Sequence, residues 1–303
     1  MSEDFHIKYV NRTTGQLGKE KIYGFKAVRW LYQSSLGKFF AAFLVQKWLS
    51  FLYGLWQNTV FSRRKVAPFI RDFSINMNEF QPGSYAQNKI EDSYKSFNEF
   101  FIRRFKPGQR NFVSNGSLPA VAEARYVGYE EINPTISFPV KGKFLTLAQL
   151  LRPEDQKIFN GAFLIARLCP VDYHRYHYPD DGTVERSYTL SGELHSVNPL
   201  ALALKPDIFL KNEKRVAILN TKNFGKLAYI EVGAICVGKI VQSHDESKAF
   251  QRGDEKGYFL FGGSTVILIG QKGQWCPSLD ILKNTKAGIE TYIQLGDVIG
   301  TKS

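Results

Sequence analysis

The stretch FLFGGSTVILIG, residues 259–270, joins two strongly apolar runs through two glycines, a serine and a threonine. The second run, STVILIG (264–270), is apolar enough to form a strand that is buried on both faces of a sheet. Gly262 and Gly263 between apolar runs are typical of a tight hairpin turn. The same glycines also permit backbone angles that other residues resist, so the peptide bond before Ser264 could be strained and exposed beside the Ser264 hydroxyl. The pattern alone leaves both interpretations open.

Short runs rich in Val, Ile, Phe and Tyr extend from about residue 118 to the C-terminus. They include AFLIARL (162–168), KLAYIEVGAICVGKIV (226–241) and GYFLF (257–261), which Gly, Asn and Pro separate at intervals typical of strands. Helical signals are fewer: Ser96 begins a capping box, and LTLAQLL (145–151) has a helical pattern. We therefore expect an α+β protein in which residues 95–303 form a mainly antiparallel β domain.

The first 94 residues have a different composition. The range 21–71 holds nine basic residues and no acid, within a chain of net charge +12. Within it, WLYQSSLGKFFAAFLVQKWLSFLYGLW (30–56) repeats apolar residues at helical spacing, which indicates one or two amphipathic helices. Lys38 and Lys47 interrupt every apolar run, so none reaches the roughly 20 residues of a transmembrane helix.

The basic region has three candidate partners: an anionic bilayer, the protein's own core and a nucleic acid. Tryptophans beside lysines and arginines fit helices that lie in the headgroup region of an anionic bilayer. A helical hairpin packed on the protein's own core would show the same periodicity, whereas no nucleic-acid module is recognisable, so we expect no nucleic-acid partner. We expect residues 1–94 to be a basic, amphipathic helical region that associates peripherally with the cytoplasmic face of the cell membrane. Three scattered cysteines and a polar N-terminus fit a reducing compartment and no signal peptide.

Two of the five histidines lie in PVDYHRYHYPDDG (170–182). His174 and His177, with tyrosines and acids beside them, favour acid–base chemistry, although either one alone could be structural and donate to a backbone carbonyl. Three aspartates lie in the same segment: Asp172, Asp180 and Asp181. Because HExxH, cysteine-pair and EF-hand patterns are missing, we expect no metal site.

Several blocks together closely resemble the phosphatidylserine decarboxylases whose signature ends in Gly-Gly-Ser-Thr. The blocks cover roughly residues 95–303 in family order and are SFNEFFIRRFKPGQR (96–110), DYHRYHYPDDGTV (172–184), GELHSVNPLAL (192–202), NEKRVAILNTKNFGKLAYIEVGAICVGKI (212–240), EKGYFLFGGSTVIL (255–268) and KAGIETYIQLGDVIG (286–300). The resemblance implies that residues 95–303 are the catalytic domain.

The resemblance also implies a proenzyme that cuts itself between Gly263 and Ser264 into a β chain (1–263) and an α chain (264–303). Ser264 would become a covalent pyruvoyl group, and the enzyme would convert phosphatidylserine to phosphatidylethanolamine and CO₂ in phospholipid biosynthesis. The family further suggests a homodimer. His177 is implied as the general base of cleavage, and His174 as the residue that assists proton transfer or holds the carboxylate during decarboxylation. The family's orienting aspartate, in Pro-x-Asp-Gly, is replaced within AVAEARY (120–126), where Glu123 is the best match.

Two other classes of protein share part of this pattern. A non-catalytic lipid-binding β module with a basic amphipathic anchor would have the features of residues 21–71 but would make no use of GGST or the histidine pair. A conventional serine hydrolase would need its serine in GxSxG, whereas Ser264 lies in GGST. The mass of the purified chain separates the lipid-binding module from a self-cleaving enzyme.

Overall fold

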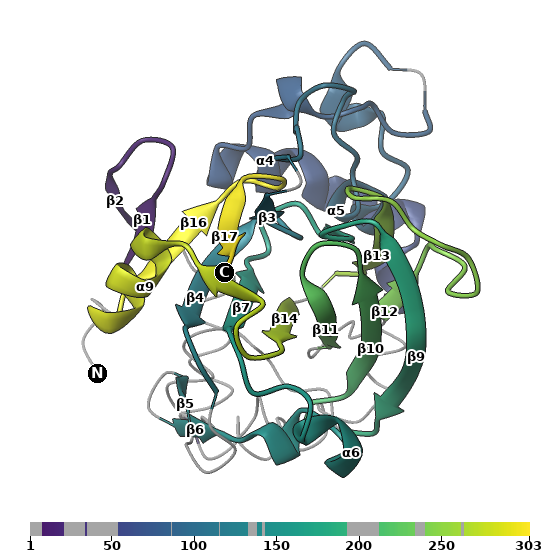
Figure 1. Cartoon of the computed structure of the whole chain (residues 1–303). Helices are drawn as coiled ribbons and strands as arrows, with labels where there is room; N and C mark the ends of the chain where they lie inside the picture. Colours follow the sequence, from purple (N-terminus) through teal and green to yellow (C-terminus); the bar gives the residue numbers. More distant parts are fainter. Residues whose placement is uncertain are drawn as a thin grey trace.

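The computed structural model describes residues 8–20, 34, 54–85, 87–114, 116–132, 138–140, 143–192, 212–233, 240–261 and 264–303. A large sheet organises this part of the chain (Figure 1). Its nine strands are, in spatial order, β2 (Leu17–Lys19), β1 (Lys8–Asn11), β16 (Glu290–Ile293), β4 (Ala124–Tyr129), β7 (Phe163–Leu168), β14 (Ser264–Gly270), β11 (Gly225–Val232), β10 (Lys214–Thr221) and β9 (Gly182–Leu190). Neighbouring strands are antiparallel, apart from the parallel pair β1 and β16, so the predicted mainly antiparallel core is confirmed.

Three smaller sheets and several short helices complete the described fold. The smaller sheets are β12 (Ile240–Gln242), β13 (Glu255–Phe259) with β8 (Arg175–His177); β15 (Trp275–Pro277), β17 (Val298–Lys302) with β3 (Ser117–Pro119); and β5 (Phe138–Val140) with β6 (Lys143–Leu145). The helices are α4 (Val66–Phe73), α5 (Phe97–Phe101), α6 (Pro153–Gln156) and α9 (Leu279–Lys286), with 3₁₀ turns η1 (Val60–Lys65), η2 (Met77–Glu79), η3 (Ile90–Asp92) and η4 (Leu147–Gln149). Figure 1 shows α4 and α5 at one end of the large sheet and α6 near the other.

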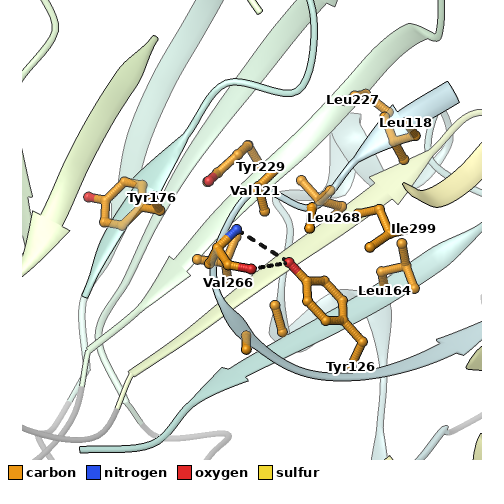
Figure 2. Packing of buried hydrophobic residues seen from close by; sticks show 14 of the residues in the cluster. Leu118, Val121, Tyr126, Leu164, Tyr176, Leu227, Tyr229, Val266, Leu268 and Ile299 are labelled. Atoms are coloured by element: carbon orange, nitrogen blue, oxygen red, sulfur yellow. Dashed lines mark hydrogen bonds between the residues drawn. The ribbon is translucent and has the colours of Figure 1, made fainter. Parts of the chain in front are cut away.

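Strand β14 lies inside the large sheet between β7 and β11, and all seven of its residues are buried. Its side chains alternate between the two faces, as the pleat requires. Val266 and Leu268 belong to one apolar cluster, together with Tyr126 (Figure 2), and Ile267 and Ile269 belong to the cluster on the opposite face. The prediction that STVILIG is buried on both faces is confirmed.

The hairpin interpretation of Gly262-Gly263 is wrong. Strand β13 pairs with β12 and β8, whereas β14 pairs with β11 and β7, so the two apolar runs belong to different sheets. The glycines therefore lie in a connection between two sheets. This connection leads directly into Ser264, the first residue of β14.

The N-terminal third is only partly described. The amphipathic helices predicted within 30–56 fall mostly outside the described residues, and residues 8–19 form strands β1 and β2 of the large sheet instead of helices. Helices α4 and α5 share one apolar cluster, which also includes Phe261 and Leu295 from the C-terminal part of the chain. Among the described residues, every helix is too short or too polar to span a membrane. The division of the chain near residue 95 stays a prediction.

Candidate active site

Ser264 occupies a closed position at the start of an inner strand. Its backbone pairs with Leu168, the last residue of β7, and the residue is 1% exposed. Strand β14 has a partner strand on each side, but at Ser264 itself the described pairing is with β7 alone, because the pairing with β11 begins at Thr265. Gly262 and Gly263, which carry the carbonyl group before Ser264, lie outside the described residues.

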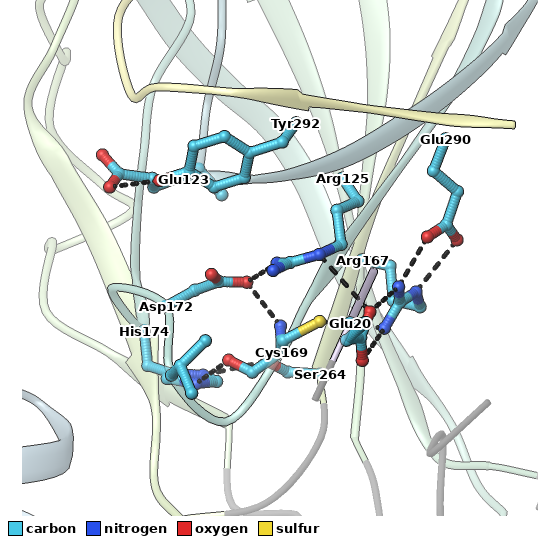
Figure 3. A network of polar contacts seen from close by, with 12 residues as sticks. Glu20, Glu123, Arg125, Arg167, Cys169, Asp172, His174, Ser264, Glu290 and Tyr292 are labelled. Carbon is cyan, nitrogen blue, oxygen red and sulfur yellow. Dashed lines mark hydrogen bonds and ion pairs between the residues drawn. The ribbon is translucent and has the colours of Figure 1, made fainter. Parts of the chain in front are cut away.

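His174 provides the polar partner of Ser264 (Figure 3). Its Nδ1 lies 3.2 Å from the Ser264 Oγ, and its Nε2 lies 2.9 Å from the backbone oxygen of Cys169. Because a carbonyl oxygen only accepts hydrogen bonds, Nε2 carries the ring proton and Nδ1 presents its lone pair to the serine hydroxyl. This arrangement is that of a general base beside its nucleophile.

The surroundings of His174 keep the imidazole neutral. The ring is fully buried and stacks on Phe101, with ring centroids 3.8 Å apart. Burial, together with the positive charge of Arg103, lowers the pKa of His174 to about 3. At neutral pH the ring therefore has a free lone pair to accept the serine proton, although the buried imidazolium that forms is costly.

Asp172 holds the loop that positions His174. Its carboxylate accepts a hydrogen bond from the backbone N–H of Cys169 at 2.6 Å, and its own N–H donates to the Cys169 carbonyl at 2.9 Å. The same carbonyl accepts the hydrogen bond from the Nε2–H of His174. Arg125 pairs with the same carboxylate, and although burial raises the pKa of Asp172, the guanidinium opposes this rise. The acid is thus linked to the histidine through the backbone of Cys169.

A buried ionic network extends from Arg125 across the large sheet (Figure 3). Glu20 lies between Arg125, at 3.4 Å, and Arg167, at 2.5 Å, and Arg167 also binds Glu290. Burial alone would raise the pKa of Glu20, but the two guanidinium groups lower it to about 2. Buried ion pairs contribute little net stability, but removal of one partner is strongly destabilising because it leaves an uncompensated charge. The network therefore links β4, β7 and β16 beside the site through charges that depend on one another.

His177 has other partners. Its Nδ1 donates to the carbonyl of Gly253 at 2.8 Å, and its Nε2 faces the hydroxyl of Tyr173 at 3.3 Å. Burial lowers the pKa of His177 as well. The structure thus brings Ser264 together with His174, whereas both ring nitrogens of His177 are engaged elsewhere. The role of His177 as the base of cleavage stays a prediction.

Glu123 also lies in a different environment from the one expected of an orienting acid. Its carboxylate binds Arg110 through both oxygens, at 2.6 and 3.0 Å, and accepts the Tyr292 hydroxyl at 2.8 Å (Figure 3). These bonds occupy both oxygens, and the described hydrogen bonds of Glu123 do not include either histidine of the site. Its place in a catalytic triad has no support from this geometry.

The sequence contains a signal that points away from Glu123. Counted from Pro119, the pattern Pro-x-Asp-Gly reaches Val121 at the position of the aspartate. The carbonyl of Val121 accepts the backbone N–H of His177 at 2.8 Å, so this position does lie beside the histidine segment. A valine cannot orient an imidazole through its side chain. Asp172, whose position in the sequence does not indicate this role, is the acid that the described contacts link to His174 through Cys169.

Two acidic residues near the histidines form ion pairs and hydrogen bonds with other side chains of the protein. Asp180 binds Arg252 at 2.8 Å and the side chain of Asn223 at 2.9 Å, and Asp172 pairs with Arg125. Within the described ranges, no three His, Cys, Asp or Glu side chains are grouped as ligands of a metal ion.

The comparisons with known proteins place this chain in a family. The family model for phosphatidylserine decarboxylase matches residues 97–300. Proteins named phosphatidylserine decarboxylase proenzyme from Clostridium tetani and Clostridium perfringens are each 38% identical, over 98% of this chain and 98% and 100% of theirs. One from Desulfitobacterium hafniense is 39% identical, over 98% of both chains. Fold and site define a mixed α+β protein with a buried serine–histidine pair at the start of an inner strand. The chain belongs to the phosphatidylserine decarboxylase family.

Proposed function

We propose that this chain is a proenzyme that cuts itself before Ser264, gains a pyruvoyl group there and decarboxylates phosphatidylserine to phosphatidylethanolamine. Membership of the family supports the reaction. The observation that carries the self-cleavage is the pairing of the Ser264 hydroxyl with the unprotonated Nδ1 of His174.

The cleavage chemistry follows from this pair. The Ser264 Oγ attacks the Gly263 carbonyl while its proton passes to the Nδ1 of His174. The bond between the Gly263 carbonyl carbon and the Ser264 nitrogen then breaks, the nitrogen takes up that proton, and the peptide bond becomes an ester. Loss of the Gly263 carboxylate by β-elimination leaves dehydroalanine, which takes up one water and releases ammonia to give pyruvoyl. The products are the chains 1–263 and 264–303. Because β14, β16 and β17 all belong to the shorter chain and pair with strands of the longer one, the two chains stay together.

The residues around Ser264 fit a pyruvoyl group. The group keeps the three-carbon skeleton of the serine, so it occupies the same buried position at the start of β14. When formed, it supplies an electron-accepting carbonyl for the loss of CO₂. His174 lies beside that position with a ring nitrogen free to hold or deliver a proton, and the stacked ring of Phe101 keeps water from its face.

A surface segment supports peripheral association with an anionic membrane. Residues 54–65 expose a group of large apolar side chains: Leu55, Trp56, Val60 and Phe61. Phe61 is 72% exposed, and three basic residues follow directly in Arg63, Arg64 and Lys65. Exposed apolar side chains beside cations are typical of surfaces that enter the headgroup region of anionic lipids.

A cavity of about 700 Å³ adjoins the α5 end of the molecule and suits an anionic headgroup. Its lining includes four cationic residues, Lys95, Arg103, Arg104 and Arg175, and one acidic residue, Glu99. Arg104 and Arg175 also pair with Glu255, so the cations outnumber the acids that they contact. Cavities of this size hold small-molecule ligands. We place the phosphate of the lipid substrate there, because that group keeps its negative charge throughout the reaction.

Release of labelled CO₂ from vesicles that contain carboxyl-labelled phosphatidylserine tests the reaction. Wild-type protein should release it, and Ser264→Ala should remain uncleaved and release none. His174→Ala and His177→Ala then separate the two histidines: we expect the His174 variant to lose cleavage by at least about a hundredfold, as for removal of a general base. Equal cleavage by the His174 variant and wild type would transfer that role to His177. Membrane binding by wild type without CO₂ release would favour the non-catalytic lipid-binding module.

A further inference from the structure

Asn98, the second residue of α5, makes two hydrogen bonds that the cleavage chemistry above does not use. The residue is 1% exposed. Its Oδ1 accepts the backbone N–H of Phe261 at 3.0 Å, and its Nδ2 donates to the Oδ1 of Asn58 at 2.9 Å. Because a backbone N–H only donates, the amide oxygen of Asn98 must face Phe261, and the amide nitrogen must face Asn58. The orientation of the side chain is therefore set by its partners.

One of these bonds lies three residues before Ser264. Phe261 is the last described residue ahead of the two glycines, and its ring packs against Phe97 and Phe101 of α5, with centroids 5.0 Å away in each case. Phe101 also stacks on His174. Helix α5 thus contacts both the approach to the peptide bond that is cut and the base that assists the cut. Because Phe261 and Ser264 bracket the bond that is cut, the positions of these two residues constrain where its carbonyl can lie.

The other bond leads to the exposed segment 54–65. Asn58 lies in this segment, and Ser62 attaches the segment to the same helix: its Oγ accepts the backbone N–H of Phe97 at 2.9 Å and donates to the carbonyls of Gln57 and Thr59. The segment with exposed Phe61 is therefore bound to α5 at two adjacent residues, Phe97 and Asn98.

We propose that Asn98 is a positioning residue for self-cleavage, which holds Phe261 so that the Gly263 carbonyl meets the Ser264 hydroxyl, and which is itself held by Asn58 of the surface segment. The proposal rests on the proposed cleavage before Ser264. Helix α5 would then connect the surface segment 54–65 to the peptide bond that is cut.

The test measures the rate of self-cleavage, by intact mass against time, for precursor made in a cell-free system. Asn98→Leu removes both bonds and leaves the buried Phe261 N–H without a partner, so we expect cleavage to slow by at least about tenfold. Asn58→Leu removes only the outer bond and should slow cleavage about threefold, whereas Asn58→Asp keeps the accepting oxygen and should stay within about twofold of wild type. Asn78→Leu, an exposed asparagine on η2, is the matched control.

The outcomes separate the positioning role from a purely structural one. Thermal unfolding of each variant in the Ser264→Ala background shows whether it is folded at the assay temperature. Cleavage of a folded Asn98→Leu at the wild-type rate would overturn the proposal, and so would equal slowing by Asn58→Leu and Asn58→Asp, since the aspartate keeps an accepting oxygen that the leucine lacks. If Asn98→Leu does not fold, the comparison of Asn58→Leu with Asn58→Asp tests the proposal. A wild-type chain that never cleaves would instead overturn the proposed function itself.

Discussion

The pH dependence of self-cleavage tests the assignment of His174 as the proton acceptor. An ordinary histidine with a pKa of 6.5 would be only about 3% unprotonated at pH 5 and would lose about 30-fold in rate between pH 8 and pH 5. Burial and Arg103 lower the pKa of His174 to about 3, so its ring stays almost fully unprotonated over this range. We therefore expect the rate of cleavage at pH 5 to lie within about twofold of the rate at pH 8.

The assay starts from precursor made in a cell-free system, transferred quickly to buffers between pH 5 and pH 8 and sampled by intact mass. Stability must be measured at the same pH values, because the lowered pKa of His174 also makes the free energy of unfolding depend on pH. The unfolded chain takes up a proton on this histidine below pH 6.5 and the folded chain does not, so stability falls as the pH falls, by about 2 kcal/mol at pH 5 for this residue. Cleavage rates are therefore compared only at pH values where circular dichroism shows that the Ser264→Ala protein is folded. A rate that drops about tenfold per pH unit below 6.5, with the protein folded, would refute the buried, neutral His174.

Three further variants test other parts of the site and surface. Asp172→Asn leaves Arg125 with Glu20 as its remaining counterion, so urea unfolding in the Ser264→Ala background should show a free energy of unfolding lower by about 3 kcal/mol. The control Asp181→Asn, whose side chain is 43% exposed, should lower it by less than about 0.5 kcal/mol. Equal losses in the two variants would contradict the buried pair of Asp172 and Arg125. Glu123→Gln should lower the free energy of unfolding by about 1–2 kcal/mol through its bond to Arg110 and leave the rate of cleavage within about twofold; a rate as low as that of His174→Ala would return Glu123 to the catalytic set. Phe61→Ser should weaken binding to anionic vesicles by about tenfold without changing the melting temperature, since the side chain is exposed in the free protein; unchanged vesicle binding would remove residues 54–65 from the membrane surface.

Much of the β core could be predicted from local patterns. The runs 162–168, 226–232 and 264–270 are strands β7, β11 and β14 because continuous apolar sequence is suited to a sheet that is covered on both faces. Ser96 begins α5 as the capping pattern predicted, with its hydroxyl accepting the backbone N–H of Glu99. The place of β13 in a separate sheet could not be predicted in this way, because a two-glycine connection has the same local chemistry whether its strands pair with each other or not.

The contacts within the site are even harder to predict from local sequence patterns. Ser264 could be found from its motif, but the choice between His174 and His177 depends on which carbonyl each ring meets, and those carbonyls belong to Cys169 and Gly253. The pair of Asp172 with Arg125 joins residues 47 positions apart and gives no local signal. The sequence indicates Glu123 only by residue type and approximate position, and its partner Arg110 can be recognised only in the folded chain.

If Ser264 becomes the first residue of a separate, blocked chain, the intact mass of the purified protein under denaturing conditions shows it. We expect two species, residues 1–263 with an ordinary C-terminus and residues 264–303 without an N-terminal amine, the shorter of which gains mass when treated with hydroxylamine. A single uncut chain of 303 residues that does not react with hydroxylamine would refute self-cleavage at Ser264.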